Sequence, residues 1–136
     1  MKYISLMLII CVFVIVTERI FPPETTPDMI TEAIAFGTER GKEVPTLPFV
    51  YDGCTLFPDK LPGLDLAHAC YEHDIAYWHG GSSEERKLAD TRLKEAAAAQ
   101  GMFGQIMQLP VYIGVHLFGD TFLTRMFNAH WGFGHE

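Results

Sequence analysis

Two adjacent helical patterns in the middle of the chain constrain the fold most strongly. The first is predicted to run from about Leu64 to Trp78, where a pair of glycines stops it. The second begins at about Ser82, which forms a capping-box pattern with Glu85, and runs to about Ala99. Because so short a connection leaves no room for a crossover, the two helices are expected to lie antiparallel. The sequence therefore predicts a mostly α fold built around this pair.

Weaker patterns flank the pair on both sides. A short helix is predicted from a cap at Thr26 to Gly37, with an apolar stripe that packs on the core. Residues 41–63 contain four prolines and three glycines, which predicts one long loop that is either functional or tied down. Residues 102–118 are strongly apolar, but Pro110 lies in their middle. We expect a broken helix there that completes the core, one face of which could meet lipid.

The amino terminus has the pattern of a targeting segment. Residues 4–16 form an apolar run of thirteen residues in which Ser5 carries the only hydroxyl. This length is typical of a signal peptide and short of the roughly 20 residues that span a bilayer. No small-residue cleavage pattern follows, so the segment is either cleaved or kept as a membrane anchor. Acylation of Cys11 is disfavoured because bulky Ile10 precedes it. Export to a periplasmic or extracellular space is predicted.

Length and charge exclude several classes of protein. A chain of 136 residues with 49% hydrophobic residues folds as one modest domain and is too apolar for a disordered tail. The net charge of −7 and the lack of a basic stripe argue against nucleic acid as a partner. No phosphate-binding glycine motif supports nucleotide binding. We divide the chain into a signal or anchor (1–20), a linker with a short helix (21–48) and the main domain (49–136).

A histidine and a carboxylate lie side by side on the first predicted helix. On a helical wheel, Leu66 and Tyr77 fall within about 40° of His73, which places His73 in the middle of an apolar face. Asp74 falls at about 100°, on the border of that face. Both side chains are therefore directed toward whatever packs on the helix. The alternative is a structural core histidine beside a solvated aspartate.

Two cysteines connect the long loop to the same helix face. Cys70 lies one turn before Asp74, and Cys54 in the loop is the only other cysteine outside the apolar leader. In an exported protein these two are expected to form a disulfide. The bond would bring Asp52 and the carbonyl of Gly53 close to Asp74. Carboxylate, carbonyl and water oxygens are the ligands that Ca²⁺ prefers.

The second helix carries a carboxylate that could orient the histidine. Asp90 borders the apolar stripe of its helix, so it can reach His73. It would contact one ring nitrogen and leave the other free to take part in a reaction. The alternative for Asp90 is an ion pair one turn away with Arg86 or Lys94.

The loop and the helix together resemble a known family. The segments DGCTLFPD (residues 52–59) and ACYEHDIAY (residues 69–77), with cysteines 16 residues apart, resemble the small secreted phospholipases A2 of bacteria and fungi. That family pairs a D-G-C-x-x-x-P-D loop with an A-C-x-x-H-D-x-x-Y helix. The similarity covers residues 51–95 and, less specifically, the Trp131–Gly134 end.

The resemblance implies a phospholipase A2-like core of two antiparallel helices with a disulfide-tethered calcium loop. It also implies Ca²⁺-dependent hydrolysis of the sn-2 ester of membrane glycerophospholipids, which releases a fatty acid and a lysophospholipid. His73 would be the general base, with Asp90 orienting it and the Tyr77 hydroxyl supporting the pair. The calcium ligands would be Asp52, the carbonyl of Gly53 and Asp74.

The chain also departs from the family, and two other classes of function compete. Many members have a second disulfide, whereas the only spare cysteine here is Cys11. One alternative is a non-catalytic lipid- or calcium-binding module that keeps the fold without turnover. Another is a small membrane-anchored structural protein that inserts residues 102–118. The sequence predicts no particular oligomeric state.

Overall fold

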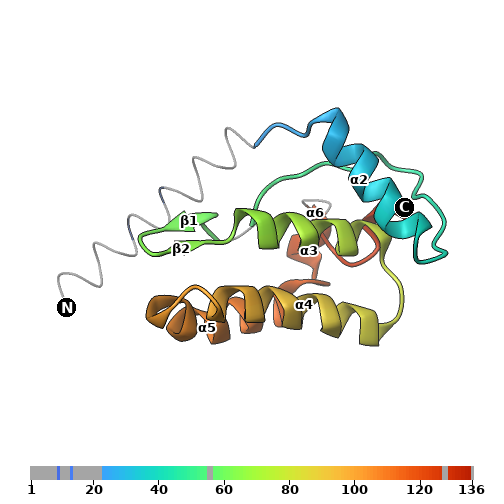
Figure 1. The fold of residues 1–136 in the computed structure, drawn as a ribbon. Helices are drawn as coiled ribbons and strands as arrows, with labels where there is room; N and C mark the ends of the chain where they lie inside the picture. Colours follow the sequence, from blue (N-terminus) through green and yellow to red (C-terminus); the bar gives the residue numbers. More distant parts are fainter. Residues whose placement is uncertain (1–8, 10–12, 14–22, 55–56, 127–128, 136) are drawn as a thin grey trace.

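The described part of the chain is mostly helical, as predicted. The computed structural model describes residues 9, 13, 23–54, 57–126 and 129–135. Its elements in chain order are α2 (Pro27–Thr38), β1 (Lys60–Leu61), β2 (Leu64–Asp65), α3 (Ala67–His79), α4 (Ser83–Ala98), α5 (Met102–Phe118), α6 (Phe122–Met126) and the 3-10 helix η1 (Phe133–His135) (Figure 1). The predicted leader (1–20) lies outside the described residues except for Ile9 and Phe13. None of the described helices is long and apolar enough to span a membrane.

Helices α3 and α4 form the predicted antiparallel pair (Figure 1). The capping box at the start of α4 is complete: the Glu85 N–H donates to Ser82 Oγ over 3.2 Å, and the Ser82 N–H donates to Glu85 Oε2 over 2.7 Å. Gly80 and Gly81 connect the helices with φ angles of 63° and 136°, which side chains disfavour. Two local sequence signals, the glycine pair and the capping box, thus set where α3 ends and where α4 begins.

The prediction of an unbroken loop over residues 41–63 was wrong at its end. Lys60 pairs with Asp65, and Leu61 with Leu64, in a two-stranded antiparallel hairpin. The turn between them uses Gly63 at a φ of 78°, which glycine adopts without strain. Leu64 is buried in the hairpin. Helix α3 therefore begins at Ala67, three residues later than predicted.

The remainder of the long loop is tied down by buried contacts. The Trp78 indole N–H donates to the Leu47 carbonyl over 2.9 Å, and the Leu47 N–H donates to the Gly134 carbonyl over 2.9 Å. Phe49 packs edge-to-face on Tyr71 and Trp78, with ring centroids 6.0 and 5.5 Å away. The segment around Leu47 and Phe49 is thus part of the core, which holds the loop against α3.

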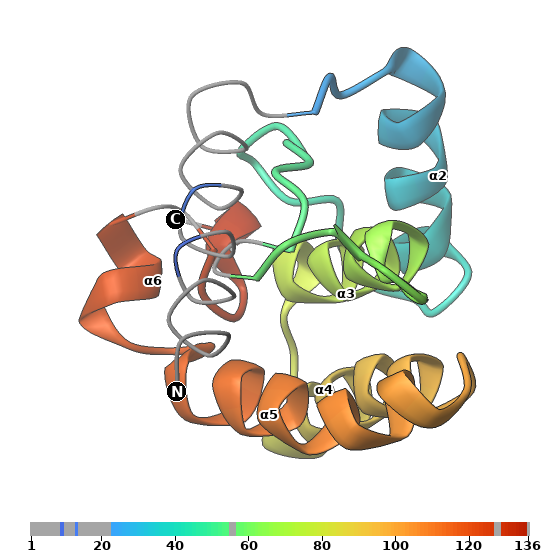
Figure 2. The ribbon, with the colours of Figure 1, turned by 90° about the vertical axis from the view of Figure 1, so that its left-hand side faces the viewer.

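The prediction of a broken helix at residues 102–118 was also wrong. Helix α5 runs continuously through Pro110, packed beside α4 (Figure 2). Gly104 allows this packing, because a Cβ there would collide with the Ala97 carbonyl. Contacts along the helix, including the buried Val111, offset the hydrogen bond that the proline removes.

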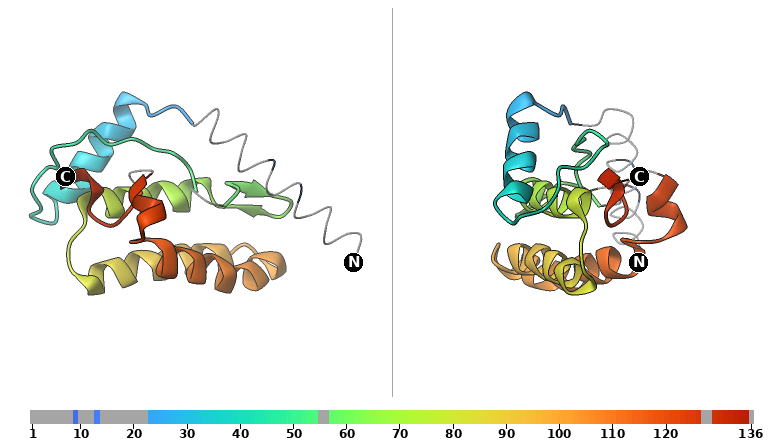
Figure 3. Two further views of the ribbon diagram at one scale, coloured as in Figure 1. Left: turned by 180° about the vertical axis from the view of Figure 1, so that it is seen from behind. Right: turned by 90° about the vertical axis from the view of Figure 1, so that its right-hand side faces the viewer.

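The C-terminal segment packs on the core. Trp131 contacts Tyr77 edge-to-face with ring centroids 5.1 Å apart, and Phe133 is buried. The Gly132 N–H donates to the Tyr77 carbonyl over 2.6 Å, which places η1 against α3 (Figure 3). These contacts close one side of the region where α3 and α4 meet.

Helix α2 is attached to α3 through a buried histidine. The Thr26 hydroxyl caps α2 by accepting from the Met29 N–H over 3.3 Å, and Ala33 is completely buried. His79 Nε2 donates to the Ala33 carbonyl over 2.7 Å, while its ring packs on Phe36. Burial lowers the pKa of His79. The folded state therefore favours the neutral ring.

This burial predicts a loss of stability in mild acid. The unfolded chain binds a proton at His79 below about pH 6.5, whereas the folded chain resists it. The contribution is complete above that pH and falls as the pH drops through it. Between pH 7.5 and 5.5 we expect a loss of up to about 1 kcal/mol in the free energy of unfolding, measured with urea. If a His79→Gln variant loses just as much unfolding free energy between pH 7.5 and 5.5, protonation of His79 is not the cause.

Candidate functional site

A histidine, an aspartate and a tyrosine meet between α3 and α4. His73 Nε2 lies 3.0 Å from Asp90 Oδ1, and the Tyr77 hydroxyl donates to the same oxygen over 2.8 Å. The Tyr77 ring also stacks on the His73 ring with centroids 4.2 Å apart. Asp90 is completely buried. The contact predicted between Asp90 and His73 is therefore present, while their catalytic roles stay predictions.

Among the described residues, neither Arg86 nor Lys94 forms the alternative ion pair with Asp90. Arg86 Nε instead donates to the Tyr77 hydroxyl over 3.4 Å, and its Nη2 donates to the His116 carbonyl over 2.9 Å. Arg86 thus donates to the same Tyr77 hydroxyl that donates to Asp90.

The charges in this cluster follow from its hydrogen bonds. Burial acts to raise the pKa of Asp90, but hydrogen bonds from His73 and Tyr77 outweigh it and hold the pKa below its usual value. Burial and the nearby Asp90 charge raise the pKa of Tyr77, which keeps its hydroxyl protonated. Because an ionised carboxylate only accepts, His73 carries its proton on Nε2. Its Nδ1 is then the nitrogen that can accept a proton.

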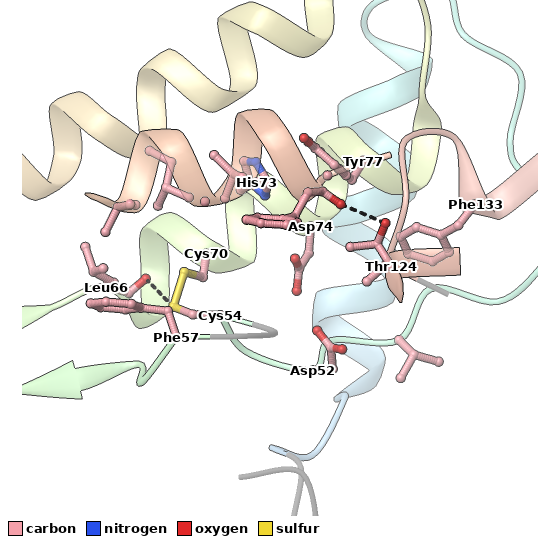
Figure 4. Close-up of a pocket in the computed structure, with 18 of the residues that line it drawn as sticks. Asp52, Cys54, Phe57, Leu66, Cys70, His73, Asp74, Tyr77, Thr124 and Phe133 are labelled. Carbon is pink, nitrogen blue, oxygen red and sulfur yellow. Dashed lines mark hydrogen bonds between the residues drawn. A yellow bond between two sulfur atoms is a disulfide. The ribbon is translucent and has the colours of Figure 1, made fainter. Parts of the chain in front are cut away.

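His73 and Tyr77 of this cluster lie on the wall of a cavity of about 580 Å³ (Figure 4). Asp52, His73 and Asp74 supply charged or ionisable groups to this cavity, and most other lining residues are apolar. The sequence patterns did not identify its far wall, which α5 and the C-terminal segment provide. That wall includes Val111, Val115, Phe118, Thr124 and Phe133.

The predicted disulfide between Cys54 and Cys70 is confirmed. It joins the loop to α3 with the two Cα atoms 5.1 Å apart. Next to it, the Cys54 N–H donates to Asp59 Oδ1 over 2.7 Å. Gly53 has a φ of 78°, and a Cβ there would lie 2.7 Å from the Asp59 carboxylate. Glycine is therefore required for this loop conformation, which sets the position of Asp52.

The site has oxygen donors of the kind that Ca²⁺ uses. The carboxylates of Asp52 and Asp74 point toward one another across the cavity, and Asp74 Oδ2 is buried (Figure 4). In the ranges that the structure describes, no group of three or more His, Cys, Asp or Glu side chains could hold a metal ion. A calcium ion would therefore need backbone carbonyls, such as that of Gly53, and water to complete its 6–8 ligands.

Removal of one carboxylate tests this assignment. The variant Asp74→Asn is expected to weaken Ca²⁺ binding by about tenfold or more, because an amide replaces a charged ligand. Titration calorimetry on the full chain measures this. Asp65→Asn is the matched control, since Asp65 is exposed and pairs with Lys60 over 3.0 Å away from the cavity. Equal affinity in wild type and Asp74→Asn would refute the assignment.

Comparison with known proteins adds no assignment to this geometry. The chain matches no family model, no curated protein and no solved structure. Fold and site are therefore interpreted from their own residues, and the phospholipase A2 motifs remain a resemblance.

Proposed function

We propose that the protein hydrolyses the sn-2 ester of glycerophospholipids in a Ca²⁺-dependent reaction, releasing a fatty acid and a lysophospholipid. One observation carries the proposal: His73, hydrogen-bonded through Nε2 to a buried aspartate, lies on the wall of an apolar cavity that also contains two facing carboxylates. A base, an oxygen-ligand site and an apolar substrate volume are the three parts that this reaction needs.

The residues support attack by water rather than a covalent intermediate. His73 Nδ1 takes a proton from a water molecule while the oxygen of that water bonds to the ester carbonyl carbon. Asp90 stabilises the resulting imidazolium, and Tyr77 holds the carboxylate in place. The ester C–O bond then breaks, and His73 returns the proton to the leaving glycerol oxygen. Ca²⁺, when held by Asp52 and Asp74, would polarise the carbonyl and stabilise the developing oxyanion.

The cavity lining suits an acyl chain. Phe57, Leu66, Val111 and Val115 surround the space beside His73. An apolar chain that fills the cavity displaces water from its walls and gains hydrophobic free energy. The carboxylates of the lining and its histidine come from Asp52, His73 and Asp74, where the ester would lie.

A lipid surface is the partner that fits the outside of α5. A stripe of exposed apolar side chains follows one face of the helix, comprising Met102, Ile106, Leu109, Ile113 and Leu117. Residues 102–118 contain no Asp, Glu, Lys or Arg. Phe118 is 49% exposed and also lines the cavity, so the apolar surface continues from the stripe into it. With a net charge of −7, the chain is better suited to zwitterionic than to anionic lipid.

The disulfide fits an exported protein. Such bonds persist in oxidising compartments, and residues 4–16 have the length of an export signal. We therefore propose a periplasmic or extracellular location, with these residues as a membrane anchor if they are not cleaved.

Release of fatty acid from phosphatidylcholine vesicles tests the function. The full chain is incubated with vesicles in Ca²⁺, in EGTA and in Mg²⁺, and free fatty acid is measured. Release in Ca²⁺ alone is expected, because Mg²⁺ prefers a smaller octahedral site. If the protein binds calcium and sediments with the vesicles but releases no fatty acid, the non-catalytic binding module replaces the hydrolase.

A further inference from the structure

A second histidine contacts the aspartate that orients His73. His116 Nδ1, on α5, lies 3.2 Å from Asp90 Oδ2, the carboxylate oxygen that neither His73 nor Tyr77 contacts. Three helices therefore converge on one buried carboxylate, with α3 supplying donors to Oδ1 and α5 supplying one to Oδ2. Nothing in the local sequence patterns predicts this contact, because His116 lies 26 residues from Asp90.

The imidazole of His116 contacts the Tyr112 ring as well as Asp90. Its backbone carbonyl accepts from Arg86 Nη2 over 2.9 Å, which fixes this turn of α5 on α4. The Tyr112 ring stacks on the imidazole with centroids 5.2 Å apart and planes 10° from parallel. Lys94 Nζ in turn lies 5.5 Å from the centre of the Tyr112 ring. The side chain is 44% exposed, and its contacts with Asp90 and Tyr112 orient the ring.

We propose that His116 is a positioning residue for the hydrolysis: it donates from Nδ1 to Asp90 Oδ2 and so fixes the carboxylate that orients His73. This inference rests on the proposed function. A carboxylate held at one oxygen only can rotate about its χ2 bond or take up a proton. Either change removes the fixed acceptor of His73 Nε2, and with it the orientation of Nδ1 toward water. His116 therefore acts on turnover through Asp90 and does not touch the ester.

The proton positions of the two histidines give a test that does not depend on activity. Because Asp90 only accepts, His116 must carry its proton on Nδ1 and His73 on Nε2. Long-range ¹H–¹⁵N spectra of the histidine-labelled full chain, recorded near pH 8, distinguish these tautomers. We expect His116 as the Nδ1–H form in wild type. We expect His73 to become a mixture of tautomers in His116→Ala. An Nε2–H form of His116 in wild type would overturn the proposal.

Kinetics on phosphatidylcholine in Ca²⁺ provide the second readout. His116→Ala is expected to lower kcat roughly tenfold or more with KM and Ca²⁺ affinity unchanged. His116→Asn keeps an N–H at the position of Nδ1 and should restore most of kcat. Gln105→Ala, an exposed position on the same helix, is the matched control. An unchanged kcat in His116→Ala, or no recovery in His116→Asn, overturns the proposal.

The two readouts separate this inference from the proposed function. If wild type hydrolyses no lipid, the hydrolase fails, while the spectra still decide whether His116 fixes the proton of His73. If wild type is active but the His73 tautomer does not respond to His116→Ala, the hydrolase stands and the positioning role fails.

Discussion

Replacing His73 with glutamine is expected to lower kcat for phospholipid hydrolysis by about 10²–10⁴-fold, the usual contribution of a positioned general base. Glutamine has a similar length and can keep the hydrogen bond to Asp90 through its amide N–H, but it cannot take a proton from water. The loss should therefore fall on kcat, with little change in KM. Initial rates of fatty acid release from phosphatidylcholine, at saturating Ca²⁺, measure both constants.

A matched histidine variant and a binding measurement make this result specific. His68 lies on the same helix with its side chain 83% exposed, so His68→Gln should keep wild-type turnover. His73→Gln should also keep the calcium affinity and the circular dichroism spectrum of wild type. Retained turnover in folded His73→Gln would show that the base is another residue.

Removing the disulfide has the largest effect expected on stability. The bond between Cys54 and Cys70 closes a loop with a sequence separation of 16 residues. Such a crosslink contributes about 3 kcal/mol by restricting the unfolded chain. The double variant Cys54→Ala with Cys70→Ala should therefore lose about that much in the free energy of unfolding, measured by urea titration. It should also bind Ca²⁺ more weakly, because the bond attaches the Asp52 loop to α3.

Reduction supplies the control for this prediction. Dithiothreitol should lower the stability of wild type toward that of the double variant and leave the double variant unchanged. Equal stability of oxidised wild type and the double variant would mean that the contacts of Leu47 and Phe49, not the bond, hold the loop.

The features that the sequence predicted correctly depend on local signals. The Ser82–Glu85 capping box and the following helix come from residues close in sequence, so their pattern is legible without the fold. The disulfide followed from the cysteine number and from the prediction that the chain is exported. The approach of Asp90 to His73 followed because a short turn leaves the two helices antiparallel, with His73 on the apolar face of one helix and Asp90 at the border of the apolar stripe of the other.

The features that were missed depend on contacts between distant segments. Helix α5 stays continuous through Pro110 because α4 packs along it, and the sequence pattern alone shows only the breaker. In the sequence, His116 is an isolated polar residue in an apolar run. Its contact with Asp90 is evident only once α5 lies beside α4. The cavity's far wall comes from the same helix and from the C-terminal segment, whose positions no local spacing fixes. The hairpin is the exception, because its Pro62–Gly63 turn is a local signal; these residues were interpreted only as breakers of regular structure.

The identity of the product from an asymmetric phosphatidylcholine tests the central claim most directly. The substrate carries different acyl chains at sn-1 and sn-2, and the full chain acts on it as vesicles in Ca²⁺ or in EGTA, with both products identified by mass spectrometry. We expect the sn-2 fatty acid and the 1-acyl lysophospholipid in equal amounts, in Ca²⁺ only. Release of the sn-1 chain, release in EGTA, or no release by folded protein with bound calcium would contradict this claim.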